Sequence, residues 1–296
     1  MVNKKEIIKA IKPKLNYDTA IKDFEELEDL PKKDVVSKPS NVGNNFVDYF
    51  TFLERTNTIG KHNVSFWNVW NDRSEYKKKR YVRNLLLYYK TNHPKMTPPQ
   101  VWWRIFNVYF ASISIFKPTY AMTIYYKFEP TSILDFTMGW GGRLVGAAAM
   151  NIPYYTGIDM NKELEKPYKE MVKVLKKYSH TKVKLIFKDA LKVDYSKIKY
   201  DLVLTSPPYY NLEVYSHQEE AYKTKKEWNE KFYIPIVSMT YKYLSVGGYY
   251  CLNVPEEVYE NVLIDLLGKA DMFIPLMKQI RSITEYKEFT YVWKKK

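Results

Sequence analysis

Residues 205–210, with the sequence TSPPYY, carry the most specific chemistry in the chain and directly follow a short apolar stretch. Pro207 and Pro208 remove two backbone donors and stiffen the loop. The carbonyls of Ser206 and Pro207 are then fixed acceptors beside a serine hydroxyl, and an aromatic ring follows at Tyr209. Such a loop can hold a planar group that bears an NH2, with two acceptors on the amine and one ring on the base. The structural alternative is a rigid turn after a strand.

A glycine-rich turn follows Asp135 and ends an earlier apolar stretch. Gly139, Gly141 and Gly142 let the backbone approach a ligand closely, because glycine adopts positive φ at little cost. The spacing is not the dinucleotide G-x-G-x-x-G, and the Gly-Lys-Ser/Thr of a P-loop does not follow. The turn indicates a ligand-binding loop, with a tight strand-to-helix connection as the alternative.

Two acidic residues follow the next two apolar stretches. Asp159 lies about 20 residues after the glycine turn, where an acidic side chain can accept hydrogen bonds from two ribose hydroxyls. Its alternative is an N-cap for the helix that begins near Asn161. Asp189 is positioned to face an adenine amino group, although a surface-loop role is the more ordinary interpretation of this residue alone.

The elements that position these residues alternate from about residue 130 onward. We expect helices at 144–150, 161–178, 225–244 and 256–268, between strands at 132–136, 154–159, 183–187, 201–205, 248–254, 271–278 and 286–293. Such alternation predicts a Rossmann-like α/β fold, with a mostly parallel seven-stranded sheet and helices on both faces. The last two strands have no helix between them and predict an antiparallel hairpin at one edge. Ligands of such sheets bind at the carboxyl ends of the strands.

The first 95 residues lack this alternation of strands and helices, and their pattern predicts a mainly helical region. We place a domain boundary there, with a catalytic domain at 96–296. The expected helices are one or two over 4–29, a short one at 46–55, a basic one at 73–92 and one opened by the prolines of 96–100.

Composition limits the class of protein. Hydrophobic residues make up 46% and charged residues 27% of the 296 residues, which is typical of a folded chain. A single cysteine, Cys251, excludes a disulfide framework and a cysteine-built zinc site, and four scattered histidines suggest no metal site. No apolar run has membrane-spanning length, and the first residues lack a signal-peptide core. We expect a reduced, intracellular and cytoplasmic protein, with the nucleus or a viral factory as alternatives.

The net charge of +14 is unevenly distributed, and residues 73–95 carry eight basic side chains against Glu75 alone. Tyrosines are interleaved with these charges, which suits a surface for phosphates and bases. The alternative is a solvated helix face. The predicted nucleic-acid contacts, including the second tyrosine of the loop, are Lys77, Lys78, Lys79, Arg80, Arg83 and Tyr210.

Two of these motifs resemble those of a known family. SPPY at 206–209 resembles the (D/N/S)-P-P-(Y/F/W) catalytic motif of the S-adenosylmethionine-dependent amino-methyltransferases of DNA, the N6-adenine and N4-cytosine group. Residues 135–141 resemble their D-P-F-x-G-x-G cofactor motif, with Phe136 near the family's aromatic position. Thr137 and Met138 depart from the compact motif.

The segment ahead of the first strand extends the resemblance, which covers about residues 98–296. Lys117-Pro118 resembles the K-P motif that opens the helix preceding that strand. GWGGR followed by SPPYYNLEVY also resembles methylases of phages and large DNA viruses. No variable insertion separates the motifs, so the N-terminal 95 residues are the best substitute for a target-recognition domain.

The resemblance implies direct methyl transfer from S-adenosylmethionine to the exocyclic amine of a flipped-out base, stacked on Tyr209. The Thr-Ser-Pro-Pro-Tyr variant of the motif slightly favours N4 of cytosine over N6 of adenine as the methylated atom. DNA is the expected partner. RNA, or a non-catalytic subunit of a methylase complex, is an alternative, and oligomeric state stays open. The implied catalytic residues are Ser206, Pro207, Pro208 and Tyr209, and the implied cofactor contacts are Lys117, Pro118, Asp135, Phe136, Gly139, Gly141, Gly142, Asp159 and Asp189.

Overall fold

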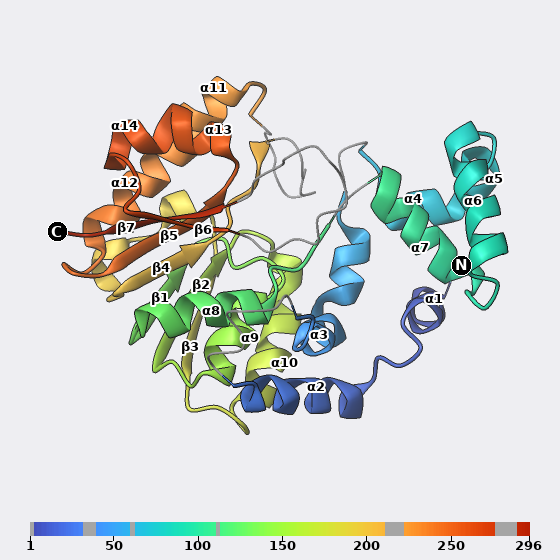
Figure 1. Cartoon of the computed structure of the whole chain (residues 1–296), viewed down its shortest axis with the longest axis horizontal. Coiled ribbons are helices and arrows are strands. Elements are labelled where there is room, and N and C mark those ends of the chain that lie inside the picture. The colour runs from blue at the N-terminus through green and yellow to red at the C-terminus, as the bar shows by residue number, and fades with distance from the viewer. Residues whose placement is uncertain (1–2, 32–39, 60–62, 111–112, 211–221, 276–288) are drawn as a thin grey trace.

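The computed structural model describes residues 3–31, 40–59, 63–110, 113–210, 222–275 and 289–296. These residues contain a seven-stranded sheet in the order β3-β2-β1-β4-β5-β7-β6 (Figure 1). Neighbouring strands from β3 to β5 are parallel, whereas β7 is antiparallel to β5 and β6. The prediction of a mostly parallel seven-stranded α/β fold with an antiparallel edge pair is confirmed. The strands are β1 (Ser132–Asp135), β2 (Tyr154–Asp159), β3 (Lys182–Phe187), β4 (Leu202–Thr205), β5 (Tyr249–Val254), β6 (Met272–Pro275) and β7 (Phe289–Lys294).

Helices cover both faces of this sheet, because its central strands are apolar on both sides. In β4, Leu202 and Leu204 pack into one layer and Val203 into the other, as the alternation of a strand requires. A strand buried on both faces reads as a continuous apolar run, which explains the sequence LVLT. One layer contains α8 (Pro118–Phe128), α9 (Gly142–Ala149) and α10 (Glu165–Leu175), and the other contains α11 (Lys225–Trp228), α12 (Ile234–Tyr243), α13 (Glu256–Val258) and α14 (Ile264–Leu267).

Short helical turns complete the second layer and the strand connections. The predicted helices at 225–244 and 256–268 each contain a π turn, which joins α11 to α12 and α13 to α14. The π turns are η5 (Asn229–Tyr233) and η6 (Tyr259–Leu263), and the 3₁₀ turns are η1 (Lys162–Leu164), η2 (Ala190–Lys192) and η3 (Tyr195–Lys197).

The N-terminal region is helical, as predicted, and part of it belongs to the sheet's own core. Helices α2 and α3 pack against α9 and α10, whereas α1, α4, α5, α6 and α7 form a group beside the sheet (Figure 1). Capping boxes begin α2, α4 and α7. The helices are α1 (Lys4–Ile11), α2 (Tyr17–Asp29), α3 (Asn44–Asn57), α4 (Phe66–Asn71), α5 (Arg73–Tyr76), α6 (Arg80–Asn92) and α7 (Pro98–Tyr109).

The single basic helix predicted over 73–92 is wrong. Helix α5 ends at Tyr76 and α6 begins at Arg80, with a turn between them. Lys79 is extended, with φ −74° and ψ 128°, and Arg83 Nη1 donates to the Lys78 carbonyl at 2.6 Å. Like charges close together oppose a continuous helix, and the break gives that carbonyl a charged donor.

Helix α7 lies after the predicted domain boundary but packs against α1 and α6, which lie before it. Thr97 Oγ1 donates to the Ala10 carbonyl at 3.4 Å, and Gln100 Nε2 donates to the Ile11 carbonyl at 3.5 Å. The packing therefore groups α7 with the N-terminal helices rather than with the sheet.

Candidate active site

The glycine turn and the SPPY loop lie at the carboxyl ends of two adjacent strands. The turn follows β1 and the loop follows β4, and β1 is where the strand order reverses, the usual ligand site of an open α/β sheet. Thr137 N donates to Thr205 Oγ1 at 3.2 Å, and the two hydroxyl oxygens are 2.6 Å apart. The structure thus brings the two predicted motifs together.

Asp135 organises this corner from inside the core. Its carboxylate is 0% exposed and accepts hydrogen bonds from Arg143 Nε at 2.7 Å, Tyr155 OH at 2.6 Å and Thr205 Oγ1 at 2.8 Å. A buried carboxylate requires such partners. This side chain links β1, β2, β4 and α9, and the contact of Asp135 with a cofactor stays a prediction.

Arg143 is the buried cation of this network. Burial opposes its charge, but the attraction and hydrogen bond of Asp135 outweigh that cost and raise the pKa of Arg143. Burial, followed by the Asp135 charge, raises the pKa of Tyr155 well above its usual value. Arg143 also donates to the carbonyl of Thr137 and lies over the Phe116 ring at 4.9 Å. The ion pair therefore fixes the first residue of the turn.

The three glycines of the turn serve different purposes. Gly139 has φ 56°, and a Cβ there would meet nothing nearer than 3.9 Å, so this position is open to a ligand. A Cβ on Gly142 would come within 1.8 Å of the Phe116 carbonyl, and Gly141 has φ 101°. Tyr168 OH donates to the Gly139 carbonyl at 2.9 Å. Gly139 is thus the member of the turn that faces open space, whereas Gly142 allows close packing.

Two residues of the predicted cofactor motifs have structural positions. Phe136 is 1% exposed and packs within the core layer of α11 to α14, and its contact with a cofactor stays a prediction. Pro118 is buried at the first position of α8, and half-buried Lys117 occupies its N-cap. The preceding carbonyl, of Phe116, is the one that contacts Gly142. The K-P motif therefore lies against the glycine turn.

Asp159 lies beside the open glycine. Its Oδ2 accepts from Gly139 N at 2.9 Å and its Oδ1 accepts from Asn161 N at 2.9 Å. Burial raises the pKa of Asp159 to about 6. Each oxygen retains a lone pair after these bonds, which suits two further donors. Asn161, rather than Asp159, caps η1, since its side chain accepts from Glu163 N at 3.0 Å.

Asp189 follows β3 and caps η2. Its Oδ1 accepts from Leu191 N at 3.0 Å, and Lys192 Nζ lies 3.7 Å from its Oδ2. The capping alternative for this residue is thus present in the structure, and its contact with an adenine stays a prediction.

The SPPY loop is held by neutral hydrogen bonds. Ser206 Oγ and Tyr209 OH are 3.1 Å apart, and they lie 3.2 Å and 2.7 Å from Asn253 Oδ1. Tyr233 OH donates to the Pro208 carbonyl at 2.6 Å. Among the described residues, the Pro207 carbonyl receives no main-chain hydrogen bond.

Tyr210 is buried, and its contact with nucleic acid stays a prediction. Its ring is 7% exposed and packs edge-on against Trp228, and its hydroxyl donates to Asn229 Oδ1 at 3.2 Å. Its φ of 51° turns the chain at the end of the loop. The turn directs the Tyr210 ring into the core, and its contacts there hold the end of the SPPY loop.

Sequence reasoning missed Arg143, Tyr155 and Asn253. Arg143 follows the glycines in an otherwise apolar helix start, and Asn253 is an amide near the end of an apolar strand. The rule that strand ends carry chemistry, applied to the fifth strand, identifies Asn253. No local pattern marks Tyr155, because a tyrosine within a strand is ordinary.

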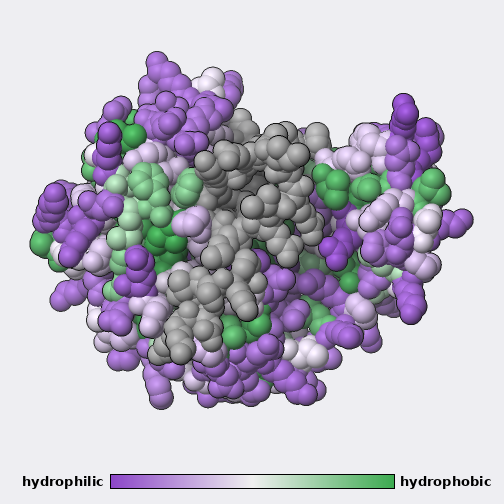
Figure 2. Space-filling view, viewed as in Figure 1, coloured by the Kyte–Doolittle hydropathy of each residue, from purple (hydrophilic) through white to green (hydrophobic). Residues whose placement is uncertain are grey.

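The predicted basic contacts are exposed around the break between α5 and α6. Lys77, Lys78, Lys79, Arg80 and Arg83 all face solvent. Lys78 Nζ pairs with Glu75 at 2.8 Å. Figure 2 shows hydrophilic side chains over this end of the molecule, with apolar side chains among them.

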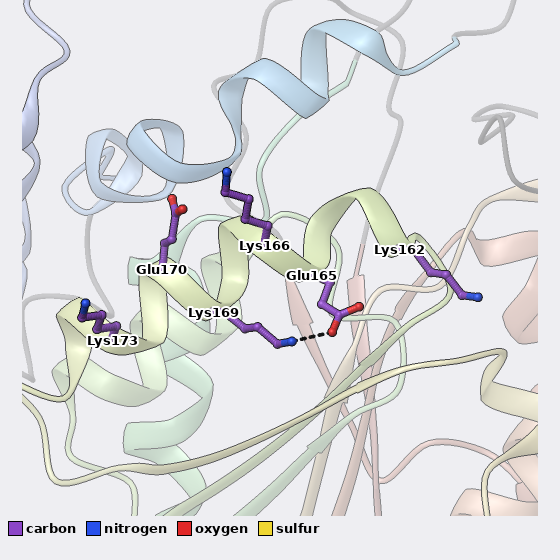
Figure 3. A pocket seen from close by; sticks show the side chains of 6 residues that line it. All are labelled: Lys162, Glu165, Lys166, Lys169, Glu170 and Lys173. Carbon is purple, nitrogen blue, oxygen red and sulfur yellow. Dashed lines mark hydrogen bonds and ion pairs between the residues drawn. The ribbon is translucent and has the colours of Figure 1, made fainter.

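A second basic region was not predicted. Residues 162–199 carry twelve lysines against five acidic residues, so this region and 73–95 together account for the whole net charge. A groove of about 520 Å³ runs along α10, where Lys169 pairs with Glu165 at 2.6 Å (Figure 3). Its lining includes no residue of the glycine turn or of the SPPY loop, so we do not locate the reaction there. The lining is Lys162, Glu165, Lys166, Lys169, Glu170 and Lys173.

Other chemistries find little support in the part of the chain that the structure describes. Cys251 is buried on β5, and burial raises the pKa of its thiol, so a thiolate nucleophile is disfavoured. No group of three metal-ligating side chains occurs among the described residues. Within the same residues, no helix combines the length and the apolar character needed to cross a membrane.

No family model and no curated protein matches the sequence. The fold is similar to several solved methyltransferases. TrmN from Thermus thermophilus is 16% identical over 60% of this chain and 48% of its own, with a TM-score of 0.43. An rRNA methylase from Streptococcus thermophilus is 12% identical over 56% of this chain and 87% of its own, with a TM-score of 0.37.

A third similar structure is the tRNA m1G37 methyltransferase of M. jannaschii, which is 17% identical over 55% of this chain and 44% of its own, with a TM-score of 0.34. The chain thus spans about half the length of TrmN and of this enzyme. At these identities and TM-scores the functional proposal rests on the site itself.

Proposed function

We propose that this protein transfers a methyl group from S-adenosylmethionine to the exocyclic amino group of a flipped-out base in DNA, with N4 of cytosine slightly favoured over N6 of adenine. The observation that carries the proposal is the hydrogen-bonded contact between Thr137 of the glycine turn and Thr205 of the SPPY strand. That contact puts a loop suited to a planar amine next to a turn suited to a nucleoside.

The turn has features that fit the cofactor. Gly139 leaves open space for a close backbone approach, and the adjacent Asp159 carboxylate has one unused lone pair on each oxygen. Two ribose hydroxyls are the natural donors for such a carboxylate. Asp189, at the next strand end, would receive the adenine amine.

The loop has features that fit the amine. When bound, S-adenosylmethionine would supply a methyl group on a sulfonium and leave as the neutral thioether, and the proton lost by the methylated amine would pass to solvent water. Ser206 Oγ and the Pro207 carbonyl would accept the two N–H groups, aim the lone pair and stabilise the positive charge that develops on nitrogen. Pro208 stiffens the loop, and Tyr209 would stack on the base.

The basic turn between α5 and α6 supports a polyanionic substrate. Lys77, Lys78, Lys79, Arg80 and Arg83 are exposed there and would contact phosphates. These contacts, together with stacking, would offset the few kcal/mol that base flipping costs.

The test is product identification. The protein is incubated with methyl-labelled S-adenosylmethionine and duplex DNA, single-stranded DNA or RNA, and each nucleic acid is digested to nucleosides for mass spectrometry. We expect labelled N4-methyldeoxycytidine, or N6-methyldeoxyadenosine if adenine is the target.

The same experiment separates the alternatives. Label in RNA alone would replace DNA by RNA as the substrate. Cofactor binding by calorimetry without label in any nucleic acid would identify a non-catalytic subunit, and absence of both would refute the proposal.

A further inference from the structure

Asn253, near the end of β5, joins the Ser206–Tyr209 loop to strand β7. Its side chain is 2% exposed, and its Nδ2 donates to the Phe289 carbonyl at 3.1 Å. A carbonyl oxygen only accepts hydrogen bonds, so this contact fixes which end of the carboxamide is nitrogen. The oxygen end, Oδ1, therefore faces the two hydroxyls of the loop.

Four oxygens then meet with two hydroxyl protons among them, because the main-chain carbonyl of Asn253 also lies 3.3 Å from Tyr209 OH. Tyr209 OH lies 2.7 Å from Asn253 Oδ1, Ser206 Oγ lies 3.2 Å from the same atom, and the hydroxyls are 3.1 Å apart. Because Oδ1 cannot donate, the shortest bond takes the Tyr209 proton. The Ser206 proton then points to Oδ1 or to the Tyr209 oxygen, and in both arrangements Ser206 Oγ keeps a lone pair for another donor.

We infer that Asn253 is a positioning residue that turns the Ser206 hydroxyl into an acceptor and thereby selects a nucleobase amino group over a carbonyl. The inference rests on the proposed function. An amino group donates to this oxygen, whereas the carbonyl of uracil, thymine or hypoxanthine would present a lone pair to a lone pair. A site built to bond a substrate N–H strongly rejects an analogue that lacks it.

The test compares three variants. Asn253→Leu removes the acceptor at similar volume. Asn253→Asp, which burial keeps protonated, retains a carbonyl oxygen facing both hydroxyls while its OH donates to the Phe289 carbonyl. Asn107→Leu is the matched control, because Asn107 Nδ2 also donates to a carbonyl, that of Trp103 at 2.7 Å, but on α7. Calorimetry with S-adenosylmethionine reports whether each variant retains the cofactor site.

Two measurements are made on each variant. The first is the NMR signal of ¹³Cζ-labelled Tyr209, assigned with Tyr209→Phe, which reports the hydrogen bonding of that hydroxyl without any turnover. The second is kcat, together with the ratio of binding affinities for oligonucleotides that carry an amino base or its keto counterpart at the target position. The pairs are cytosine with uracil and adenine with hypoxanthine.

For Asn253→Leu we expect a displaced Tyr209 signal, a kcat lower by about 100-fold from misplacement of the loop, a weakened preference for amino over keto bases, and unchanged cofactor affinity. Asn253→Asp should recover kcat to within a few-fold, and Asn107→Leu should match the wild type. A purely structural role would lower stability without changing the preference between bases.

An unmoved Tyr209 signal in Asn253→Leu, or an undiminished preference for amino bases, would overturn the inference. If the wild type methylates no nucleic acid, the proposed function fails. The Tyr209 signal still decides whether Asn253 determines the direction in which the loop hydroxyls donate their hydrogen bonds. Should Asn253→Leu lose cofactor binding, Asn253→Ser, whose shorter side chain cannot span both contacts, takes its place in the same measurements.

Discussion

The glycine turn and the SPPY loop are neighbours at one corner of the sheet, but different kinds of bond hold them. The turn is fixed by a buried ion pair between Asp135 and Arg143, with further bonds to Tyr155 and Thr205. The loop is fixed by neutral hydroxyls and one carboxamide, that of Asn253.

The difference follows from what each half has to present. A buried charge must have its partners inside the protein, so the Asp135 network is complete without a ligand. Hydroxyls and main-chain carbonyls have spare lone pairs after bonding within the protein. The half that carries the buried charge provides rigidity, and the neutral half retains acceptors for a substrate.

The largest effect is expected from a substitution in the buried ion pair that holds the glycine turn. Arg143→Met leaves Asp135 buried and unpaired, and we expect a loss of about 3–5 kcal/mol in the free energy of unfolding. Chemical denaturation measures it, and exposed Arg80→Met, expected within about 0.5 kcal/mol of the wild type, is the control. A loss below about 1 kcal/mol for Arg143→Met would show that the network is not what fixes the turn.

A smaller effect is expected from substitutions in the neutral SPPY loop, which should lower activity without unfolding the protein. Ser206→Ala removes one acceptor from the amine, and we expect kcat to fall by about 10²–10³-fold. The free energy of unfolding should change by only about 1 kcal/mol. Tyr209→Ala should also abolish methylation with cofactor affinity intact, and turnover at the wild-type rate in that variant would remove Tyr209 from the base site.

Asp159 differs from Asp135, because its carboxylate keeps lone pairs that no protein donor uses. Asp159→Ala should weaken S-adenosylmethionine binding by about 10–100-fold through the loss of two hydrogen bonds to ribose. Unchanged affinity by calorimetry would argue against the ribose assignment.

The raised pKa of Asp159, about 6, gives the same assignment a pH dependence. The carboxylate gains a proton as the pH falls through about 6 and loses acceptor capacity, so cofactor affinity should decline below that pH. Asp159→Asn, which cannot titrate, should show a flat profile between pH 5 and 8 if this group is responsible, where both limits are about one to two units from the pKa.

The smallest expected effect lies outside both halves. Replacing Lys77, Lys78, Lys79 and Arg80 by alanine should lower DNA affinity and flatten its dependence on salt by about one unit per lost phosphate contact. Fluorescence anisotropy at several salt concentrations measures the slope. The matched set is Lys162, Lys166, Lys169 and Lys173, and a flatter slope only in that set would move the DNA surface to α10.

The fold and the location of the site could be predicted because they depend on local signals. Alternating apolar strands and helices fix the sheet, and the chemistry-bearing residues at 135–142 and 206–209 follow two of those strands. The rule that parallel strands end at a common edge was enough to place both motifs at one corner.

The direction of individual side chains could not be predicted in the same way. Asp135, Phe136 and Tyr210 are close to the ligand motifs in sequence, yet all three are buried. Whether a side chain at a strand end faces the ligand or the core depends on partners distant in sequence. Arg143 and Tyr155 for Asp135, and Trp228 for Tyr210, are such partners. The break at Lys77–Lys79 has a local origin, in the repulsion of neighbouring like charges and the Arg83–Lys78 hydrogen bond, neither of which helical periodicity contains.

The hydroxyl contact between Thr137 and Thr205 has a consequence for motion. Since 2.6 Å separates the two oxygens, a hydrogen bond opposes separation of the glycine turn from the end of β4. The gap that a methyl group would cross is then determined when the chain folds, and little local rearrangement should be required once both substrates are bound. On this basis a more viscous solvent would slow their entry and exit far more than the transfer itself.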